Sequence, residues 1–263
     1  MEEIRAYNIL GSLAIVNFPE KYSKKKKVDF AKSIMKNNKI VKTVLEKTGK
    51  FKGRLRKMET KHVFGEKTKE VLYKENGCVF RFNIDTTYFS PRLSGERKEV
   101  ASLVGKDDEV LVLFAGVAPF SLVIAKNSQA KKVYSNELNR EANKYAKLNI
   151  ELNKLQGKVE LANGDAKKVC AKFAAAKKTF DVICMPRPQL KDSFLGDVFK
   201  VSKKGTRIYY YDFCLVKDIS KKVDMVKEEA GKVGKQINIL GFKEAGAIAP
   251  GKARIRIDLE VLN

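Results

Sequence analysis

A glycine and two acidic residues stand where three successive predicted strands end. Gly116 follows the first strand, Glu137 comes 21 residues later after the second, and Asp165 follows the third. Glycine lets a backbone pass close to a ligand, and an acid at this separation can accept hydrogen bonds from both hydroxyls of a ribose. A further acid can reach an adenine amino group. The pattern predicts one adenosine site where the strands end.

Each of the three residues also has an ordinary local interpretation. Gly116 fits a tight turn, Glu137 fits an acid favoured at a helix N-terminus, and Asp165 fits the cap of a helix that starts at Ala166. Three such features in register favour a joint adenosine site over three separate local roles. We therefore predict a cofactor-binding set made of Phe114, Ala115, Gly116, Val117, Pro119, Phe120, Glu137, Leu138, Gly164, Asp165, Ala166 and Met185.

The turn around Gly116 also argues against other nucleotide cofactors. Its Gly-x-x-Pro pattern lacks the further glycines of a dinucleotide-binding turn and the Gly-Lys-Ser/Thr of a phosphate-binding loop. A pyrophosphate is therefore not the expected ligand, which disfavours an NAD-dependent oxidoreductase.

An alternation of strands and helices must position these residues. It predicts an α/β domain with a mostly parallel sheet and helices on both faces. The last two strands follow one another without a helix, so we expect an antiparallel edge hairpin. The predicted strands are 109–114, 132–135, 158–161, 180–184, 206–211, 236–241 and 254–262, and the predicted helices are 120–126, 139–153, 166–175, 189–201 and 218–233.

A smaller basic α+β domain is expected at residues 1–90, followed by a connector at 91–107 and the large domain at 108–263. Gly11 bends an early strand, Ser23 can cap a helix, and Asn76-Gly77 is a strong hairpin signal. We expect a monomer.

The charge balance points to a polyanionic partner. The chain has 54 Lys and Arg residues against 31 Asp and Glu residues, a formal net charge of +23. Solubility alone does not require such an excess, so nucleic acid is favoured over a merely solvated basic surface. The candidate phosphate-binding surface joins Lys24–Lys27 to a basic segment that contains Lys50, Lys52, Arg54, Arg56 and Lys57.

Cysteine and histidine usage argues against a metal site. The four cysteines form no Cys-x-x-Cys pair and His62 is the single histidine, so neither zinc nor a disulfide framework is expected. No signal peptide and no apolar stretch of about 20 residues is evident, so we expect a cytoplasmic protein without a membrane partner.

Several motifs resemble the archaeal and eukaryotic tRNA (guanine-37-N1) methyltransferase family and its relatives in wyosine synthesis. The similarity covers nearly the whole chain, and the connector together with the Phe-Ala-Gly-Val loop makes it fairly specific. The motifs are Gly11–Val16, Glu75–Phe80, Tyr88–Arg97, Phe114–Ser121 and Asn136–Asn139.

The resemblance implies a Rossmann-like class I methyltransferase sheet, S-adenosylmethionine as donor, and tRNA as substrate, with the small domain gripping the anticodon stem-loop. Family members usually carry a further N-terminal domain, and this chain begins close to the small domain. We expect positive charge to replace part of its contribution to tRNA recognition.

The loop after the fourth strand departs from the family's usual Asn-Leu-Pro and is Met185-Pro186-Arg187-Pro188. It is more similar to an archaeal subgroup in which some members methylate C7 of the wyosine precursor. N1 methylation alone, both activities, and C7 methylation alone remain open, and a non-catalytic RNA-binding protein is the more distant alternative.

Methylation at guanine N1 removes a proton and places negative charge on O6. Arg92 or Arg97 is expected to stabilise O6, although either could instead contact phosphate or pair with Glu96. Pro186 and Pro188 can form one wall of the base pocket or simply end a strand. The candidate general bases are Glu96, Glu137 and Asp165.

Overall fold

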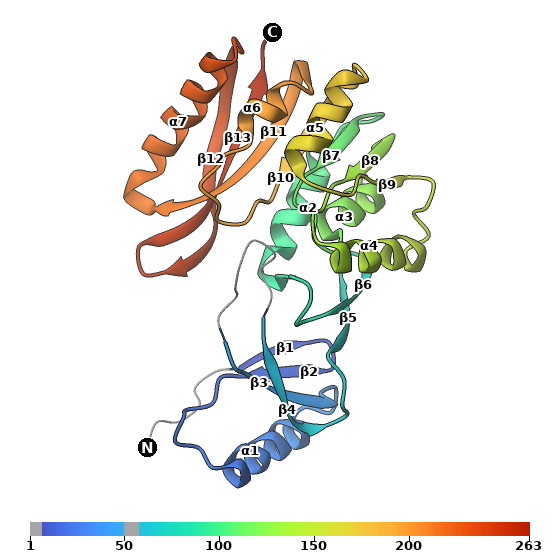
Figure 1. Ribbon diagram of the computed structural model, residues 1–263, viewed down its shortest axis with the longest axis vertical. Coiled ribbons are helices and arrows are strands. Elements are labelled where there is room, and N and C mark those ends of the chain that lie inside the picture. The colour runs from blue at the N-terminus through green and yellow to red at the C-terminus, as the bar shows by residue number, and fades with distance from the viewer. Residues whose placement is uncertain (1–6, 50–57) are drawn as a thin grey trace.

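The computed structural model describes residues 7–49 and 58–263. A large α/β body carries a smaller lobe formed by the N-terminal part of the chain, and the strands Glu70–Glu75 and Cys78–Asn83 lie between the two (Figure 1). The candidate cofactor residues lie in the body, so its sheet determines their positions.

The sheet of the body has the strand order β12-β13-β11-β10-β7-β8-β9. Neighbouring strands are parallel except where β13 pairs antiparallel with β11 and with β12. The order reverses beside β7, which is where ligands bind in open α/β sheets. The strands are β7 (Glu109–Val112), β8 (Lys132–Ser135), β9 (Val159–Leu161), β10 (Phe180–Met185), β11 (Ser202–Leu215), β12 (Ile237–Ala249) and β13 (Lys252–Val261).

Helices cover both faces of this sheet because alternate residues of each strand point to opposite sides. Val110 and Val112 of β7 pack with α2, α3 and α4, whereas Leu111 and Leu113 pack with α5, α6 and α7. This confirms the predicted α/β class. The helices are α2 (Ser94–Ser102), α3 (Pro119–Asn127), α4 (Arg140–Leu152), α5 (Ala166–Ala175), α6 (Leu195–Phe199) and α7 (Ile219–Lys232), with short 3-10 turns η1 (Pro91–Leu93) and η2 (Val216–Asp218).

Three elements differ clearly in length from the sequence prediction. β12 covers Ile237–Ala249 instead of 236–241, because β13 pairs with it as far as Ala249. α6 occupies only Leu195–Phe199 of the predicted helix 189–201, because the preceding loop is held in another conformation and Phe194 has a left-handed φ of 64°. β11 extends over 14 residues, since β13 provides it with a partner from Arg207 to Leu215.

The small lobe is a four-stranded sheet with one helix. β1 (Tyr7–Leu10), β2 (Leu13–Val16), β3 (Thr43–Lys47) and β4 (Thr60–Gly65) lie in this order, and α1 (Lys24–Asn37) crosses between the parallel strands β2 and β3. The predicted cap is confirmed, because the Ser23 hydroxyl accepts a hydrogen bond from the Lys26 amide at 3.3 Å. β3 and β4 have no clear sequence signal.

A separate hairpin joins the small lobe to the body. β5 (Glu70–Glu75) and β6 (Cys78–Asn83) meet at Asn76-Gly77, whose φ values of 47° and 72° fit the predicted tight turn.

Asn149 of α4 and Asn153, the C-terminal cap of this helix, bond to the backbone of β6. Asn149 accepts from the Arg81 amide at 2.7 Å and donates to its carbonyl at 3.1 Å, and Asn153 does the same for Val79 at 2.9 and 2.7 Å. Sequence alone assigns the hairpin to the small domain, but these bonds attach it to the body. We propose a domain boundary between β4 and β5.

A buried ion pair fixes the hairpin to the connector. Arg97 is 1% exposed, forms a two-bond pair with Glu75, and donates to the Ser90 carbonyl at 2.9 Å. Its guanidinium lies over the rings of Phe89 and Phe120. The structure therefore does not support substrate contact by Arg97, one of the two arginines predicted for O6.

We predict that Arg97→Met lowers the free energy of unfolding by about 3–5 kcal/mol, because it leaves Glu75 buried without its partner. The control is Arg81→Met, since Arg81 pairs with Glu70 on the same hairpin but is half exposed. That change should cost about 1 kcal/mol or less. Urea unfolding of both variants measures the difference, and equal losses would contradict a structural role for Arg97.

Candidate functional site

Hydrogen bonds join the loops that follow β7, β8 and β9. The Asn136 side chain donates to the carbonyls of Ala162 and Gly164 at 2.6 and 3.0 Å, and the Asn136 backbone carbonyl accepts from the Ala115 amide at 2.8 Å. The Gly164 amide donates to the Glu137 carbonyl at 2.9 Å. The three predicted strand ends therefore meet at one place.

Glu137 lies at the centre of this meeting point. Its carboxylate accepts from the Gly116 amide at 2.8 Å and from the Asn139 amide at 2.7 Å. A carboxylate offers about four lone-pair positions, so two remain for a ligand. The side chain also lines a cavity, as the ribose assignment requires.

The turn after β7 has an unusual backbone. Gly116 has a φ of 60°, and a Cβ there would lie 3.4 Å from the Tyr88 carbonyl oxygen. Phe114 and Ala118 also have left-handed φ values, 57° and 67°. Such a conformation costs about 1–2 kcal/mol for a residue with a side chain, and retained strain of this kind is common at ligand sites.

The cavity beside this turn has apolar walls and one carboxylate. It is lined by Tyr88, Phe114, Gly116, Asn136, Glu137, Leu138, Asn139, Ala142, Gly164, Ala166, Pro186, Pro188 and Leu190. Half of the predicted cofactor-binding set therefore lines it. Tyr88 and Leu190 lacked a site signal in the sequence, since only the fold brings the connector and the loop after β10 to this place.

The other predicted cofactor residues lie outside the cavity wall. Ala115, Val117, Pro119, Phe120 and Met185 are buried in the core and shape the turn from behind. Asp165 caps α5 by accepting from the Lys167 amide at 3.0 Å, which is the local role weighed for it.

A buried arginine holds the loop that carries Pro186 and Pro188. Arg187 is 1% exposed and pairs with Asp212 at 2.5 Å. Its other terminal nitrogen donates to the carbonyls of Leu190 and Asp192 at 2.7 and 2.6 Å. The loop is thereby fixed as a wall of the cavity.

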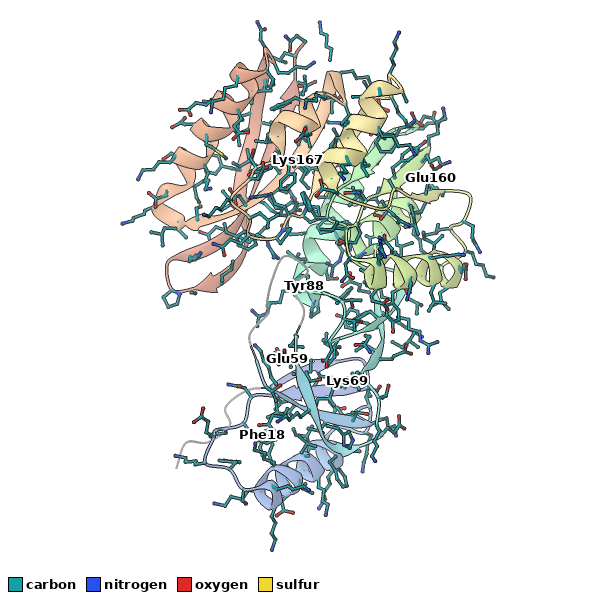
Figure 2. The ribbon with its side chains drawn as sticks, viewed as in Figure 1. Phe18, Glu59, Lys69, Tyr88, Glu160 and Lys167 are labelled. Atoms are coloured by element: carbon teal, nitrogen blue, oxygen red, sulfur yellow. The ribbon has the colours of Figure 1, made fainter. Side chains whose placement is uncertain are left out.

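A second cavity adjoins the first and shares Tyr88, Pro188 and Leu190 with it. Tyr88 lies where the body meets the small lobe (Figure 2). Arg92 lines this cavity, is exposed, and forms no ion pair with any described carboxylate. Of the two arginines considered for O6, Arg92 is the one at a cavity.

Glu96, a candidate general base, is committed to packing. Its carboxylate accepts from the Tyr211 hydroxyl and from Arg256, both at 2.9 Å, and pairs with Lys243 at 2.7 Å. These contacts attach α2 to β11, β12 and β13. Glu96 does not line either cavity.

The cysteines are free and buried, as expected for reduced thiols. Burial raises the pKa of Cys78 to about 11 and that of Cys170 to about 12, so neither forms a thiolate readily near neutral pH. Residues 7–49 and 58–263 contain no metal-binding cluster of His, Cys, Asp and Glu, and no helix of that part could cross a bilayer.

The predicted phosphate-binding surface is only partly described. Lys50, Lys52, Arg54, Arg56 and Lys57 lie outside the described residues. In the first turn of α1, Lys24–Lys26 are exposed and Lys27 pairs with Glu46 at 2.6 Å. Three lysines of that turn are therefore accessible to a polyanion.

Two family models match the chain. A model described as the TRM5/TYW2 methyltransferase domain matches residues 71–240, and one described as the TYW2 N-terminal domain matches residues 1–68. The first covers more than half of the chain.

Two relatives show 32% identity. One is the tRNA (guanine(37)-N(1))-methyltransferase Trm5b of Pyrococcus abyssi, aligned over 97% of this chain and 74% of the relative. The other is the tRNA (guanine(37)-N(1))/4-demethylwyosine(37)-methyltransferase Taw22 of Nanoarchaeum equitans, aligned over 98% of this chain and 100% of the relative.

Solved structures share the same fold. The Methanocaldococcus jannaschii Trm5 structure in complex with adenosine has a TM-score of 0.82 at 26% identity, and covers 98% of this chain and 74% of its own. A complex of aTrm5 with tRNALeu has a TM-score of 0.84 at 26% identity, over 98% and 72% of the two chains.

We predict that Arg187→Met loosens the loop from 186 to 194, because the Leu190 and Asp192 carbonyls lose their donor. It should also cost about 3–5 kcal/mol of unfolding free energy, since Asp212 loses a buried partner. Hydrogen exchange measures loop opening directly. The control is Lys222→Met, because Lys222 pairs with the other Asp212 oxygen but does not touch the loop. Unchanged exchange in Arg187→Met would contradict this role.

Proposed function

The chain belongs to the TRM5/TYW2 methyltransferase family, and we propose that it methylates N1 of the guanine at position 37 of tRNA. The donor is S-adenosylmethionine. One observation carries the proposal: a cavity with the features of an adenosine site adjoins a second cavity that contains Arg92, which pairs with no described carboxylate.

The residues of the first cavity fit the donor. Glu137 has free lone pairs for the ribose hydroxyls, while Leu138 and Ala166 offer apolar contact to the adenine. Gly116 allows the chain to pass close to the ligand. When bound, the donor supplies a methyl group on a positively charged sulfur, and the shared wall of Tyr88, Pro188 and Leu190 places the second cavity beside it.

The second cavity fits the target base. A guanine swung out of its stack can enter between the connector and the loop fixed by Arg187. The Arg92 guanidinium donates to O6, where negative charge develops as the N1 proton passes to solvent water, and Pro188 contacts the base. Pro186 lines only the first cavity, which we call the donor cavity because S-adenosylmethionine is assigned to it. No described carboxylate lines the second cavity, so Glu96, Glu137 and Asp165 are not supported as its general base.

A tRNA substrate accounts for the positive net charge of the chain and for the place where we expect the enzyme to act. The net charge of +23 favours association with RNA. Asn8, Ile15 and Lys47 of the lobe line a further cavity together with Tyr88 and Arg92, and from there the lobe can hold the anticodon stem-loop. We propose that the enzyme acts as a monomer in the cytoplasm.

A second reaction is favoured by one relative. Taw22 of Nanoarchaeum equitans, whose name includes a 4-demethylwyosine(37)-methyltransferase activity, matches this chain over its full length. We propose C7 methylation of that precursor as the alternative or additional reaction at the same position. tRNA that carries 4-demethylwyosine is the substrate that tests it.

The activity is tested by incubating the protein with labelled S-adenosylmethionine and an unmodified tRNA transcript. We expect N1-methylguanine at position 37, mapped at nucleotide resolution. A transcript with adenine at that position is the matched control and should remain unlabelled. A methyl group at another nucleotide, or no transfer at all, would contradict the proposal.

Glu137→Ala should weaken S-adenosylmethionine binding about tenfold or more, because it removes the acceptor for the ribose hydroxyls. tRNA affinity should change little. Calorimetric titration of the donor measures the first effect. Glu141→Ala is the control, since Glu141 is a nearby acid that pairs with Lys144 at the surface. Wild-type donor affinity in Glu137→Ala would remove the ribose assignment.

A further inference from the structure

The second cavity is positively charged without compensation. It has a volume of about 400 Å³ and is lined by Tyr88, Ser90, Arg92, Leu93, Pro188, Gln189, Leu190, Phe213, Ala245, Gly246, Ala247, Ile248 and Arg254. Two of these residues are arginines and none is acidic. A wall of this kind suits an anionic ligand.

These two arginines differ from most others in the described part of the chain. Five of the eight described arginines form ion pairs, namely Arg81, Arg97, Arg187, Arg207 and Arg256. Arg92, Arg140 and Arg254 pair with no described carboxylate, and Arg140 lines neither of the two adjoining cavities. The unpaired arginines are thus concentrated at one cavity.

Arg254 is held in place by an aromatic ring. Phe213 of β11 and Arg254 of β13 are register partners, and the guanidinium carbon lies 4.9 Å from the centroid of the Phe213 ring. Stacking orients the planar guanidinium, and its N–H groups have no side-chain or carbonyl acceptor among residues 7–49 and 58–263. A guanidinium held in this orientation can donate two parallel hydrogen bonds to the oxygens of a phosphate.

The cavity has two distinct ends. Tyr88, Pro188 and Leu190 also line the donor cavity, so the reacting base must lie against them. Arg254 of β13 and residues 245–248 of β12 line only the second cavity. A nucleotide whose base points toward the donor would therefore place its sugar and phosphate toward these two strands.

We propose that Arg254, stacked on Phe213, binds the backbone phosphate that flanks the target nucleotide and thereby positions its base. This rests on the proposed tRNA methylation. Arg254 acts as a positioning residue. Arg92 is closer in the chain to Tyr88, which lines both cavities, and Arg92 therefore contacts the base. The β12–β13 hairpin then contributes to substrate binding in addition to closing the sheet.

The first test compares Arg254→Gln with Arg140→Gln, which removes another charge that pairs with no described carboxylate. Arg140 does not line the second cavity, but lines a third one that shares Leu138 and Gly164 with the first. Arg254→Gln should weaken tRNA binding about tenfold and raise KM for tRNA. The slope of log affinity for tRNA against log salt concentration should become shallower by about one. Arg254→Lys should retain part of the affinity. Donor affinity should be unchanged in all variants. Equal tRNA affinity in Arg254→Gln and wild type, or equal losses in both Gln variants, would overturn the proposal.

The second test identifies the phosphate. Anticodon stem-loops with one neutral methylphosphonate at each position around nucleotide 37 are titrated against wild type and Arg254→Gln. One flanking substitution should weaken binding to wild type about tenfold and leave binding to the variant unchanged. If each methylphosphonate weakened binding to Arg254→Gln as much as it weakens binding to wild type, Arg254 would contact none of these phosphates and the proposal would be overturned. Because binding needs no methyl transfer, this failure is distinguishable from failure of the methylation assay.

Discussion

The side-chain amide of Asn136 and the carboxylate of Glu137 hold together the loops from which the rest of the site is built. Both residues follow β8, and both bond to the backbone of neighbouring loops on either side. Backbone hydrogen bonds from the Ala115 amide to the Asn136 carbonyl and from the Gly164 amide to the Glu137 carbonyl join the same loops. The sheet sets the direction of the loops, and the two side chains together with these backbone bonds set their separation. The donor cavity is the space that this spacing leaves.

Buried arginines have a second, different task in this protein. Arg97, Arg187 and Arg256 are each almost fully buried, and each joins a loop or helix to an element distant in the chain. Removing such a charge from water is costly unless several hydrogen bonds compensate, and each of the three has them. The surrounding connector, the loop after β10 and the C-terminal edge are fixed by these residues, whereas exposed lysines provide most of the field that attracts RNA.

The sequence predicts the fold well where local pattern and tertiary environment agree. The alternation of strands and helices, the Ser23 cap and the Asn76-Gly77 turn all follow from short-range rules. The full extent of β11, and the strands β3 and β4, depend on partners distant in the chain, which periodicity does not encode. The same limit applies to the site. Glu137 is predictable from its place after a strand, but the burial of Arg97 by Glu75 and the arrival of Tyr88 at the cavity depend on tertiary packing.

Two asparagines, one in α4 and one at its C-terminal cap, give the β5–β6 hairpin what a neighbouring strand would otherwise provide. Asn149 and Asn153 bond both the amide and the carbonyl of alternate β6 residues, so this edge is already satisfied by the body. The hairpin is therefore a platform that belongs to the methyltransferase body, and the sheet of β1–β4 is mounted on it. The lobe and the body are therefore joined as separate modules: another small domain could be attached at the same position, after Gly65, while the β5–β6 hairpin keeps its register on the body. Exchange of the lobe offers a physical route by which one such body could acquire new partners.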